Sequence, residues 1–280
     1  MKYNSGWLIQ NRTHMTNLPS YFISHGGGPW PFMQAEFGSA YAQLEAALQA
    51  MPAQIGVTPK AILIISAHWE EAEFTVMSNP APGMVYDYSG FPEHTYHISY
   101  PAPGSPELAA QVQSLLQAAG FVANLDAQRG YDHGTYSALY PVYPKANVPI
   151  VQLSLKTNLD PATHLAMGRA LAPLRQQGIL IIGSGLSYHN LRQFGPAGFA
   201  ASADFDAWLQ TSLMLPDNNA RTNQLIAWSQ APSARVAHPR AEHLLPLMVA
   251  VGAAQDEVAS CVYHEKTFFG GLTVSSFRFG

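Results

Sequence analysis

Short, uninterrupted apolar segments constrain the fold of this chain more than any other feature. The segments AILIISA (61–67), PIVQLSL (149–155) and ILIIGSG (179–185) are too short for typical helices and do not alternate between apolar and polar residues. Strands of this composition are usually buried on both faces, as in parallel sheets. Because helical patterns separate them along the chain, the sequence predicts an α/β fold with a central, mostly parallel or mixed sheet and helices on both faces.

Start and stop signals mark the predicted helices. Ser105 is a suitable N-cap and Gly120 ends the pattern, so a helix is expected over 105–120. Similar signals predict a helix over 160–178, in which His164 would face the surface. The other expected helices are 40–51, 203–215 and 240–254.

The chain is expected to form one domain. Its 280 residues can bury a sizeable core, and neither an internal repeat nor a linker-like change in composition divides them. Residues 19–280 are therefore predicted to be a single domain that ends in a β-hairpin, turning at Gly270–Gly271. Residues 1–18 are predicted to be a loose N-terminal leader, and the start can be Met1 or Met15.

Composition argues against several classes of partner. The net charge is −4 with no run of Lys or Arg, so no nucleic-acid partner is expected. The longest apolar runs fall far short of the roughly 20 residues of a membrane-spanning helix, so no membrane partner is expected either. A lone cysteine, Cys261, and a first segment without the apolar core of a signal peptide predict a cytoplasmic protein.

Histidines follow the apolar runs of three predicted strands. His25 follows YFIS, His68 follows AILIISA and His189 follows ILIIGSG with three residues between them. Ligands bind outside the carboxyl ends of strands in open α/β sheets, so these side chains are expected at one edge. His133, in a glycine-bounded loop, and His243, near the start of a predicted helix, can reach the same cleft. Buried imidazoles are costly unless a cation or hydrogen bonds organise them, so the pattern predicts a metal site.

Two further stretches are unusual. The glycines of SHGGGP (24–29) lack Cβ atoms, which lets the backbone turn sharply and leaves space beside a metal. The stretch 79–106 is long, rich in proline, glycine and aromatic residues, and has little periodicity. A loop of this length in a compact domain is usually functional or disordered, and its aromatic residues argue against disorder.

Six ordered segments resemble one protein family. They are SHGGGP, ISAHWE, YPAPGSPELA, DHGTYSALYPVYP, GSGLSYHNLR and AEHLLPLMVAVGAA, and the resemblance extends from Tyr21 to the C-terminus. In this order they resemble the class III extradiol ring-cleavage dioxygenases, in the branch similar to 4,5-DOPA dioxygenases (LigB superfamily). The resemblance implies one catalytic domain that opens a catechol ring, DOPA-like or of a related aromatic diol, with both atoms of O2, giving a semialdehyde-type product.

The resemblance also implies roles for the histidines. One divalent metal per chain is expected, with Fe(II) for activity and Zn(II) as an alternative bound ion. The matching positions make His25, His68 and His243 the metal ligands, with His189 beside the metal as a candidate fourth ligand. His133 matches the acid/base residue of the family, and His189 would otherwise stabilise the activated oxygen or take the second proton.

Glu242 introduces an ambiguity, because some relatives bind metal through two histidines and a carboxylate. Adjacent residues on a helix point about 100° apart, so only one of Glu242 and His243 is expected to reach the metal. The branch resemblance favours His243, which leaves Glu242 either behind the ligands or on the surface.

Other residues are candidates for contacts with the small aromatic diol. Trp69, Tyr86, Tyr88 and Tyr96 could form an aromatic wall, although ordinary packing explains them equally well, and His238 could line the cleft. A substrate carboxylate would need a cationic partner. The candidates are Lys145, Lys156, Arg192 and Arg240.

Two other functions fit the same histidines. A zinc hydrolase would use three histidines and an activated water, with Glu242 or Glu70 as base, but no HExxH motif supports it. A non-catalytic metal-binding protein could share the fold. The presence of His133 and His189 beyond a minimal ligand set argues against that alternative. The sequence does not indicate the oligomeric state.

Overall fold

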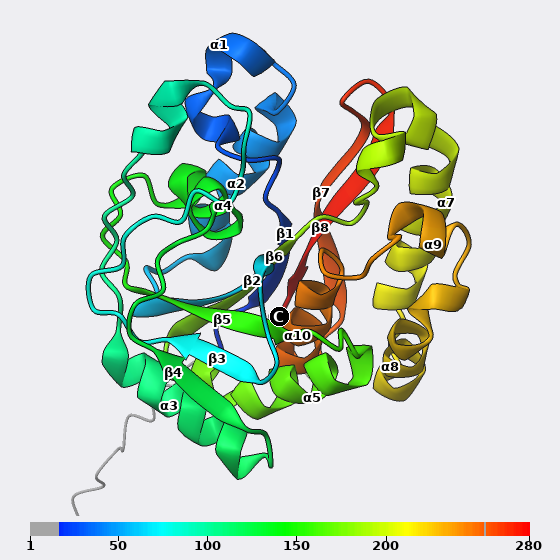
Figure 1. Cartoon of the computed structure of the whole chain (residues 1–280). Coiled ribbons are helices and arrows are strands. Elements are labelled where there is room, and N and C mark those ends of the chain that lie inside the picture. The colour runs from blue at the N-terminus through cyan, green and yellow to red at the C-terminus, as the bar shows by residue number, and fades with distance from the viewer. Residues whose placement is uncertain (1–16, 255) are drawn as a thin grey trace, which may run out of the picture.

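The strands form one mixed sheet, whose order in space differs from their order in the chain (Figure 1). The computed structural model describes residues 17–254 and 256–280. The strands are β1 (Ser20–Ser24), β2 (Ala61–Glu71), β3 (Phe74–Met77), β4 (Ala123–Asp126), β5 (Ile150–Lys156), β6 (Ile179–Gly185), β7 (Ala259–Phe268) and β8 (Leu272–Phe279). They lie in the order β4-β3-β5-β2-β6-β1-β8-β7, and β5, β2, β6 and β1 run parallel to one another.

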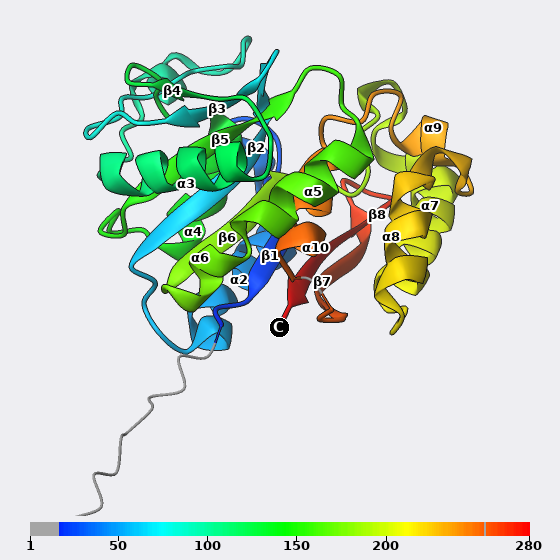
Figure 2. The same cartoon turned by 90° about the horizontal axis from the view of Figure 1, so that it is seen from below.

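Helices cover both faces of this sheet (Figures 1 and 2). The α-helices are α1 (Gln34–Phe37), α2 (Ala42–Ile55), α3 (Pro106–Ala118), α4 (His133–Val142), α5 (Pro161–Leu171), α6 (Pro173–Gln176), α7 (Phe199–Leu213), α8 (Asn218–Ile226), α9 (Ala234–Ala237) and α10 (Leu245–Ala254). Short 3₁₀ helices occupy Trp30–Phe32, Glu93–His97, Leu191–Gln193, Gly195–Gly198 and Trp228–Gln230. Helices α2 and α4 pack on one face, α3, α5 and α10 on the other, and α7 packs against β8. The predicted α/β architecture is confirmed.

The central strands are buried on both faces, as their apolar composition predicts. Every residue of β1 and β6 is buried, and the Ile62–Ile65 segment of β2 is fully inaccessible to solvent. Complete burial of one large aliphatic side chain contributes roughly 1.5–3 kcal/mol. The strands that lead to His25 and His68 therefore lie in a fully buried part of the sheet.

Three neighbouring strands end at the edge where the histidines were expected. Strands β1 and β2 both pair with β6 in parallel, so that β6 lies between them. Strand β2 is irregular at this edge, because it leaves β6 after Ser66 and its register with β5 shifts between Ile65 and Glu70. Irregularities of this kind redirect side chains, and the irregular segment carries His68.

Three expectations about helices are corrected. The helix expected over 160–178 is divided into α5 and α6, because Pro173 has no backbone N–H with which to continue the hydrogen-bond ladder. Helix α10 begins only at Leu245, so Glu242 and His243 lie in the turn before it. His133 opens helix α4 instead of lying in a loop, and Asp132 caps this helix by accepting from the Thr135 N–H.

His164 is buried in α5, which corrects its expected surface position. Its Nδ1 lies 2.7 Å from the carbonyl oxygen of Asp160 and donates to it, and its Nε2 accepts from the backbone N–H of Lys156 at 3.2 Å. Burial lowers the pKa of His164 to about 4. The neutral imidazole is therefore the form that fits this site.

Two predictions concern the ends of the chain, the C-terminal hairpin and the N-terminal leader. The C-terminal hairpin is confirmed, since β7 and β8 pair antiparallel on either side of Gly270 and Gly271. Residues 1–16 of the predicted leader lie outside the described residues, whereas Leu18 is buried and its N–H donates to the Arg175 carbonyl at 3.2 Å. Among the helices of the described residues, none is both long and apolar enough to cross a membrane.

Candidate metal centre and active site

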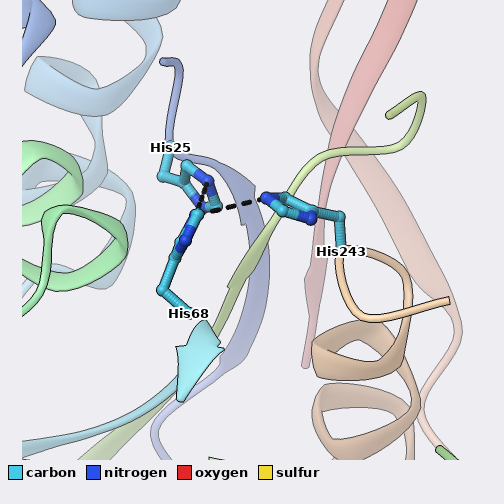
Figure 3. A group of neighbouring side chains, drawn as sticks. All are labelled: His25, His68 and His243. Atoms are coloured by element: carbon cyan, nitrogen blue, oxygen red, sulfur yellow. Dashed lines mark hydrogen bonds between the residues drawn. The ribbon is translucent and has the colours of Figure 1, made fainter. Parts of the chain in front are cut away.

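Three histidines from distant parts of the chain converge at the sheet edge (Figure 3). His25 follows β1, His68 lies in the irregular part of β2, and His243 lies in the turn before α10. The Nε2 atom of His68 is 3.1 Å from Nε2 of His25 and 3.2 Å from Nε2 of His243. We refer to these residues as the ligand histidines.

The hydrogen bond of Nδ1 in His25 shows which ring nitrogen carries the proton. Nδ1 of His25 is 3.1 Å from the Ser184 hydroxyl. That hydroxyl donates its own hydrogen to the carbonyl oxygen of Gly134, so toward His25 it can only accept. The proton of His25 is therefore on Nδ1, and Nε2 carries a lone pair.

The other two ligand histidines have the same protonation pattern. Nδ1 of His68 lies 3.2 Å from Oδ2 of Asp87, and Nδ1 of His243 lies 3.0 Å from Oε1 of Glu242. Ionised carboxylates only accept hydrogen bonds, so the hydrogen bond to Glu242 places the proton of His243 on Nδ1. The negative Oδ2 of Asp87, 3.2 Å away, favours the proton of His68 on Nδ1 as well. Three Nε2 lone pairs thus face one another, an arrangement that is repulsive without a cation. These residues fit a divalent metal bound through three Nε2 atoms.

The surroundings keep these imidazoles uncharged. Burial, reinforced by the neighbouring histidines, lowers the pKa of His25 and of His68 well below the ordinary value. Burial also lowers the pKa of His243 to about 3. Metal binding requires neutral imidazole, so the site is set up for a metal over the physiological pH range.

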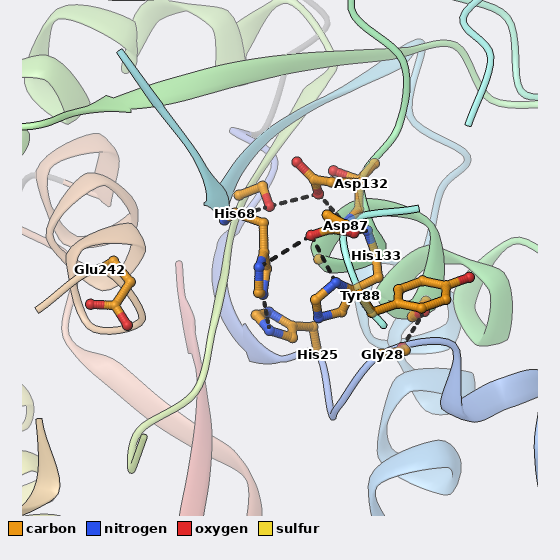
Figure 4. A network of polar contacts seen from close by, with 12 residues as sticks. His25, Gly28, His68, Asp87, Tyr88, Asp132, His133 and Glu242 are labelled. Atoms are coloured by element: carbon orange, nitrogen blue, oxygen red, sulfur yellow. Dashed lines mark hydrogen bonds and ion pairs between the residues drawn. The ribbon is translucent and has the colours of Figure 1, made fainter. Parts of the chain in front are cut away.

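His133 stands beside this cluster with a carboxylate of its own (Figure 4). Its ring centroid is 3.8 Å from that of His68, and its Nδ1 lies 2.9 Å from Oδ2 of Asp87. Burial opposes ionisation of Asp87, but its hydrogen bonds with His133 outweigh this and lower the pKa of the carboxyl group. His133 therefore holds its proton on Nδ1, which leaves Nε2 as the basic nitrogen.

The start of helix α4 is anchored to β2, and this anchor fixes the backbone of His133. Asp132 is fully buried and accepts from the Ser66 hydroxyl at 2.8 Å and from Arg129 at 2.9 Å. The backbone N–H of His133 donates to Oδ1 of Asp87 at 3.0 Å. Together these contacts fix His133 relative to the strand that carries His68.

His189 lies against the opposite side of the cluster. Its ring stacks on His243 with centroids 3.4 Å apart and planes inclined by 16°, and its Nδ1 is 3.2 Å from Oε1 of Glu242. Burial opposes ionisation of Glu242, but hydrogen bonds with both histidines outweigh this and lower the pKa of its carboxyl group. The choice between a fourth ligand and a proton-transfer group for His189 stays a prediction.

A largely apolar cavity of about 310 Å³ opens onto the histidines. It is lined by His25, Gly26, Gly27, Gly28, Phe37, Tyr41, His68, Phe91, His133, Leu186, His189, Leu191, Phe194, His243, Phe268 and Phe269. The glycines are required here: Gly28 has φ +55°, and a Cβ on it would lie 2.7 Å from the Phe91 ring. The cavity can hold an aromatic ring beside the metal position.

The residues expected to form an aromatic wall do not line this cavity. Trp69 is buried with its Nε1 donating to Glu71 at 2.9 Å. The loop tyrosines bond to backbone groups of their own loop: Tyr86 and Tyr88 donate to the carbonyl oxygens of Ile98 and Thr95, and the Tyr96 oxygen accepts from the Phe91 N–H. His238 is buried against the Ser187 carbonyl oxygen at 2.9 Å. Of the phenylalanines that line the cavity, only Phe91 belongs to this loop. The others come from segments far apart in the chain, and no sequence pattern indicates that they meet.

A polar groove adjoins the cavity and shares His189 and Leu191 with it. It carries Arg192, Arg235 and Arg240, and Arg240 forms an ion pair with Glu70. Of the other cations considered for a substrate carboxylate, Lys156 pairs with Glu73 at 2.6 Å. Lys145 lines neither the cavity nor the groove.

Asp87 and Ser184 were not identified from the sequence as parts of the site. Asp87 lies within the long loop 79–106, whose length was the one available signal. Ser184 lies inside an apolar strand, where a serine is unremarkable. Their importance depends on contacts between segments that are far apart in the chain.

Comparison with known proteins assigns the class to which this fold and site belong. Residues 19–280 match the family described as the catalytic LigB subunit of aromatic ring-opening dioxygenase. The chain belongs to this family, and its function is that of an extradiol ring-cleaving dioxygenase. Groups among the described residues could hold the metal on which such enzymes depend.

Similar proteins span most of the chain. A 4,5-DOPA dioxygenase extradiol of Beta vulgaris is 40% identical over 79% of this chain and 83% of its own length. One from Portulaca grandiflora is 37% identical over 93% and 95%, and one from Escherichia coli K12 is 32% identical over 95% and 96%. A crystal structure of an uncharacterized protein from Escherichia coli K12 superposes with a TM-score of 0.75 at 29% identity, covering 94% of this chain and 100% of the other.

Proposed function

We propose that this protein opens the ring of a catechol with O2 at a single Fe(II) held by His25, His68 and His243. The observation that carries the assignment is the convergence of three Nε2 atoms beside an apolar cavity, with Nε2 of His68 at 3.1 Å from that of His25 and 3.2 Å from that of His243. When bound, the metal would act as a Lewis acid for the diol and bring it together with O2. Three protein ligands would leave positions for both reactants.

In this proposal His133 moves the first proton. Asp87 keeps Nδ1–H in place, so Nε2 can accept a proton from a diol hydroxyl and return it later in the reaction. His189 is the second proton-transfer group, with Nδ1 held by Glu242 and Nε2 available to the cavity that His189 lines. The phenylalanines around the cavity exclude water from the ring that is being opened.

The substrate is proposed to be DOPA or a related catechol with an acidic side arm. Several relatives are named 4,5-DOPA dioxygenase extradiol. The apolar cavity suits the aromatic ring, and the groove beside it offers Arg192, an exposed residue, to a carboxylate. Arg240 is less suitable because Glu70 already neutralises it.

A zinc hydrolase is not favoured. The two carboxylates considered as bases are both engaged, Glu242 with two histidines and Glu70 with Arg240. A base that activates water must instead reach the water itself.

Anaerobic reconstitution tests the proposal. The metal-free protein is loaded with Fe(II), mixed with DOPA or another catechol, and then exposed to O2. A coloured ring-opened product with one O2 consumed per catechol is expected. The proposal fails if fully Fe(II)-loaded protein turns over no member of a broad catechol panel, or if the Zn(II) form hydrolyses substrates without O2.

A further inference from the structure

Two carboxylates contact the histidine cluster in the same way. Oδ2 of Asp87 lies 3.2 Å from Nδ1 of the ligand histidine His68 and 2.9 Å from Nδ1 of His133. Oε1 of Glu242 lies 3.0 Å from Nδ1 of the ligand histidine His243 and 3.2 Å from Nδ1 of His189. Each carboxylate therefore uses a single oxygen to join one ligand histidine to one histidine outside the ligand set.

We propose that Asp87 and Glu242 are a pair of positioning residues that couple metal binding to proton transfer. Each would hold a ligand histidine and a proton-transfer histidine in one relative orientation, through an oxygen that forms a hydrogen bond with one Nδ1 and lies 3.2 Å from the other. This inference rests on the proposed roles of the histidines. In it, the two carboxylates neither bind the metal nor transfer protons, but orient the histidines that do.

The surroundings of Asp87 support this role. Asp87 belongs to the long loop that joins β3 to α3, and Figure 4 shows its carboxylate between His68 and His133. Its second oxygen, Oδ1, accepts the backbone N–H of His133 at 3.0 Å, so the carboxylate cannot rotate without losing this bond. An asparagine could offer one oxygen at this place, but its amide N–H₂ would face a second donor.

Glu242 contacts its two histidines in the same way, but its second oxygen is held differently. This atom, Oε2, is buried without a hydrogen-bond partner among the described residues and lies 3.4 Å from Nη1 of Arg240, which also pairs with Glu70. Because residues 242 and 243 lie in a turn and not on a helix, neighbouring side chains can meet, and Nδ1 of His243 bonds to the glutamate that precedes it. Glu242 thus supports the ligands from behind, one of the two placements expected from the sequence.

The coupling has a distinctive consequence. Without either carboxylate, one ligand histidine and one proton-transfer histidine should both lose their fixed tautomer and orientation. Outer partners of metal-bound histidines typically contribute 10- to 100-fold to metal affinity. Removal of His133 itself should affect turnover only.

The test compares Asp87→Asn and Glu242→Gln with His133→Ala and with Glu93→Gln. Glu93 is a matched control, because it lies on the same loop as Asp87 but pairs with the exposed His97. The measurements are the Zn(II) dissociation constant by chelator competition, the visible spectrum of the Co(II) form under anaerobic conditions, and the melting temperature of the metal-free protein. With Fe(II) and a catechol, kcat and KM are measured separately.

Asp87→Asn and Glu242→Gln should each weaken Zn(II) binding roughly 10- to 100-fold, change the Co(II) spectrum and lower kcat more than they change KM. His133→Ala and Glu93→Gln should bind Zn(II) like the wild type. The inference is overturned if both carboxylate variants bind Zn(II) within about twofold of the wild type with an unchanged Co(II) spectrum. If Asp87→Asn does not fold, Glu242→Gln decides, because it lies on a separate segment.

The metal measurements need no substrate. Absence of catechol turnover by the wild-type Fe(II) protein would contradict the proposed function, and the Zn(II) and Co(II) data would still decide the role of the two carboxylates.

Discussion

His133 and the ligand histidines have similar surroundings at Nδ1 and differ at Nε2. In all four residues Nδ1 has an acceptor, Ser184 for His25 and a carboxylate for the others. The ligand histidines turn Nε2 toward one another, whereas His133 lines the cavity beside them. In the proposed function, the separation of metal binding from proton transfer would therefore depend on ring orientation, because the residue type is the same.

Replacement of His133 by alanine tests this separation. We expect kcat of the Fe(II) protein with a catechol to fall by about 10²–10⁴-fold, the usual contribution of a general acid or base. The Zn(II) dissociation constant should stay within about twofold of the wild type. Loss of metal binding would instead mean that His133 is a ligand.

The sequence identified five histidines that the structure does bring together, His25, His68, His133, His189 and His243. It could do so because strand ends in an open α/β sheet meet at one edge and because ordered motifs resemble a family. It could not identify Asp87 as the partner of two of them. The contacts of Asp87 with the irregular strand β2 and with helix α4 depend on how the long loop folds back, and no local pattern encodes that path.

At the level of elements, the glycine segment that follows β1 packs closely against the long loop 79–106. Gly28 has a backbone conformation that favours glycine, and the Phe91 ring occupies the space beside it. The Ser137 hydroxyl of α4 donates to the Gly28 carbonyl at 2.8 Å, so the same residue also contacts the helix that His133 opens. The glycine run therefore joins three elements of the site.

Gly28→Ala should destabilise the protein in two ways. The left-handed backbone costs about 1–2 kcal/mol for a residue with a Cβ, and displacement of Phe91 adds to this. The added part should disappear in a Phe91→Ala background, as measured by urea unfolding of all four combinations. Gly56→Ala is the control, since Gly56 also has a positive φ of 77° but open space around it. Equal losses at both glycines would contradict a role for Phe91.

Helix α5 provides a prediction for the pH dependence of stability. Burial lowers the pKa of His164 to about 4 from its ordinary value of 6.5, so below pH 6.5 the unfolded chain takes up a proton that the folded chain does not. Stability should therefore decrease as the pH falls from 6.5 to about 4, by at most ~1.4 kcal/mol per pH unit from this residue.

The comparison is between wild type and His164→Gln in urea unfolding at several pH values. The variant should lose part of the decrease between pH 6.5 and about 4, whereas His94→Gln, at an exposed position, should behave like the wild type. The same pH profile in His164→Gln and wild type would show that His164 is not responsible.

The sequence predicted the elements better than their ends. The buried strands and the helix around 105–120 follow from composition and caps, and they are confirmed. The late start of α10 and the irregularity in β2 were not predicted, because both depend on packing against neighbouring strands. These two deviations are where His243 and His68 lie.

At the level of the whole molecule, the candidate metal centre connects segments that are far apart in the chain. His25 lies just after the first strand and His243 just before the last α-helix. A metal that binds only the folded protein stabilises it by mass action. Its bonds would hold β1, β2 and the turn before α10 together.

Removal of the metal should therefore lower the melting temperature. With the metal at about 100 times its dissociation constant, the stabilisation is about 2.7 kcal/mol, which corresponds to roughly 5–10 °C in a protein of this size. Differential scanning calorimetry with and without chelator measures this shift. The His243→Ala variant should respond little to chelator, and a full shift in that variant would place the metal elsewhere.

The groove beside the cavity separates residues that could select a substrate from those proposed to carry out the reaction. It meets the cavity at His189 and Leu191, and its Arg192 and Arg235 are not among the residues that line the cavity. Substitutions of Arg192 or Arg235 would change the charge presented to the side arm of the proposed substrate, and neither residue pairs with Glu242 or a ligand histidine in the described contacts. Selection could thus alter which diols are accepted in successive descendants while the ring-opening chemistry is inherited intact.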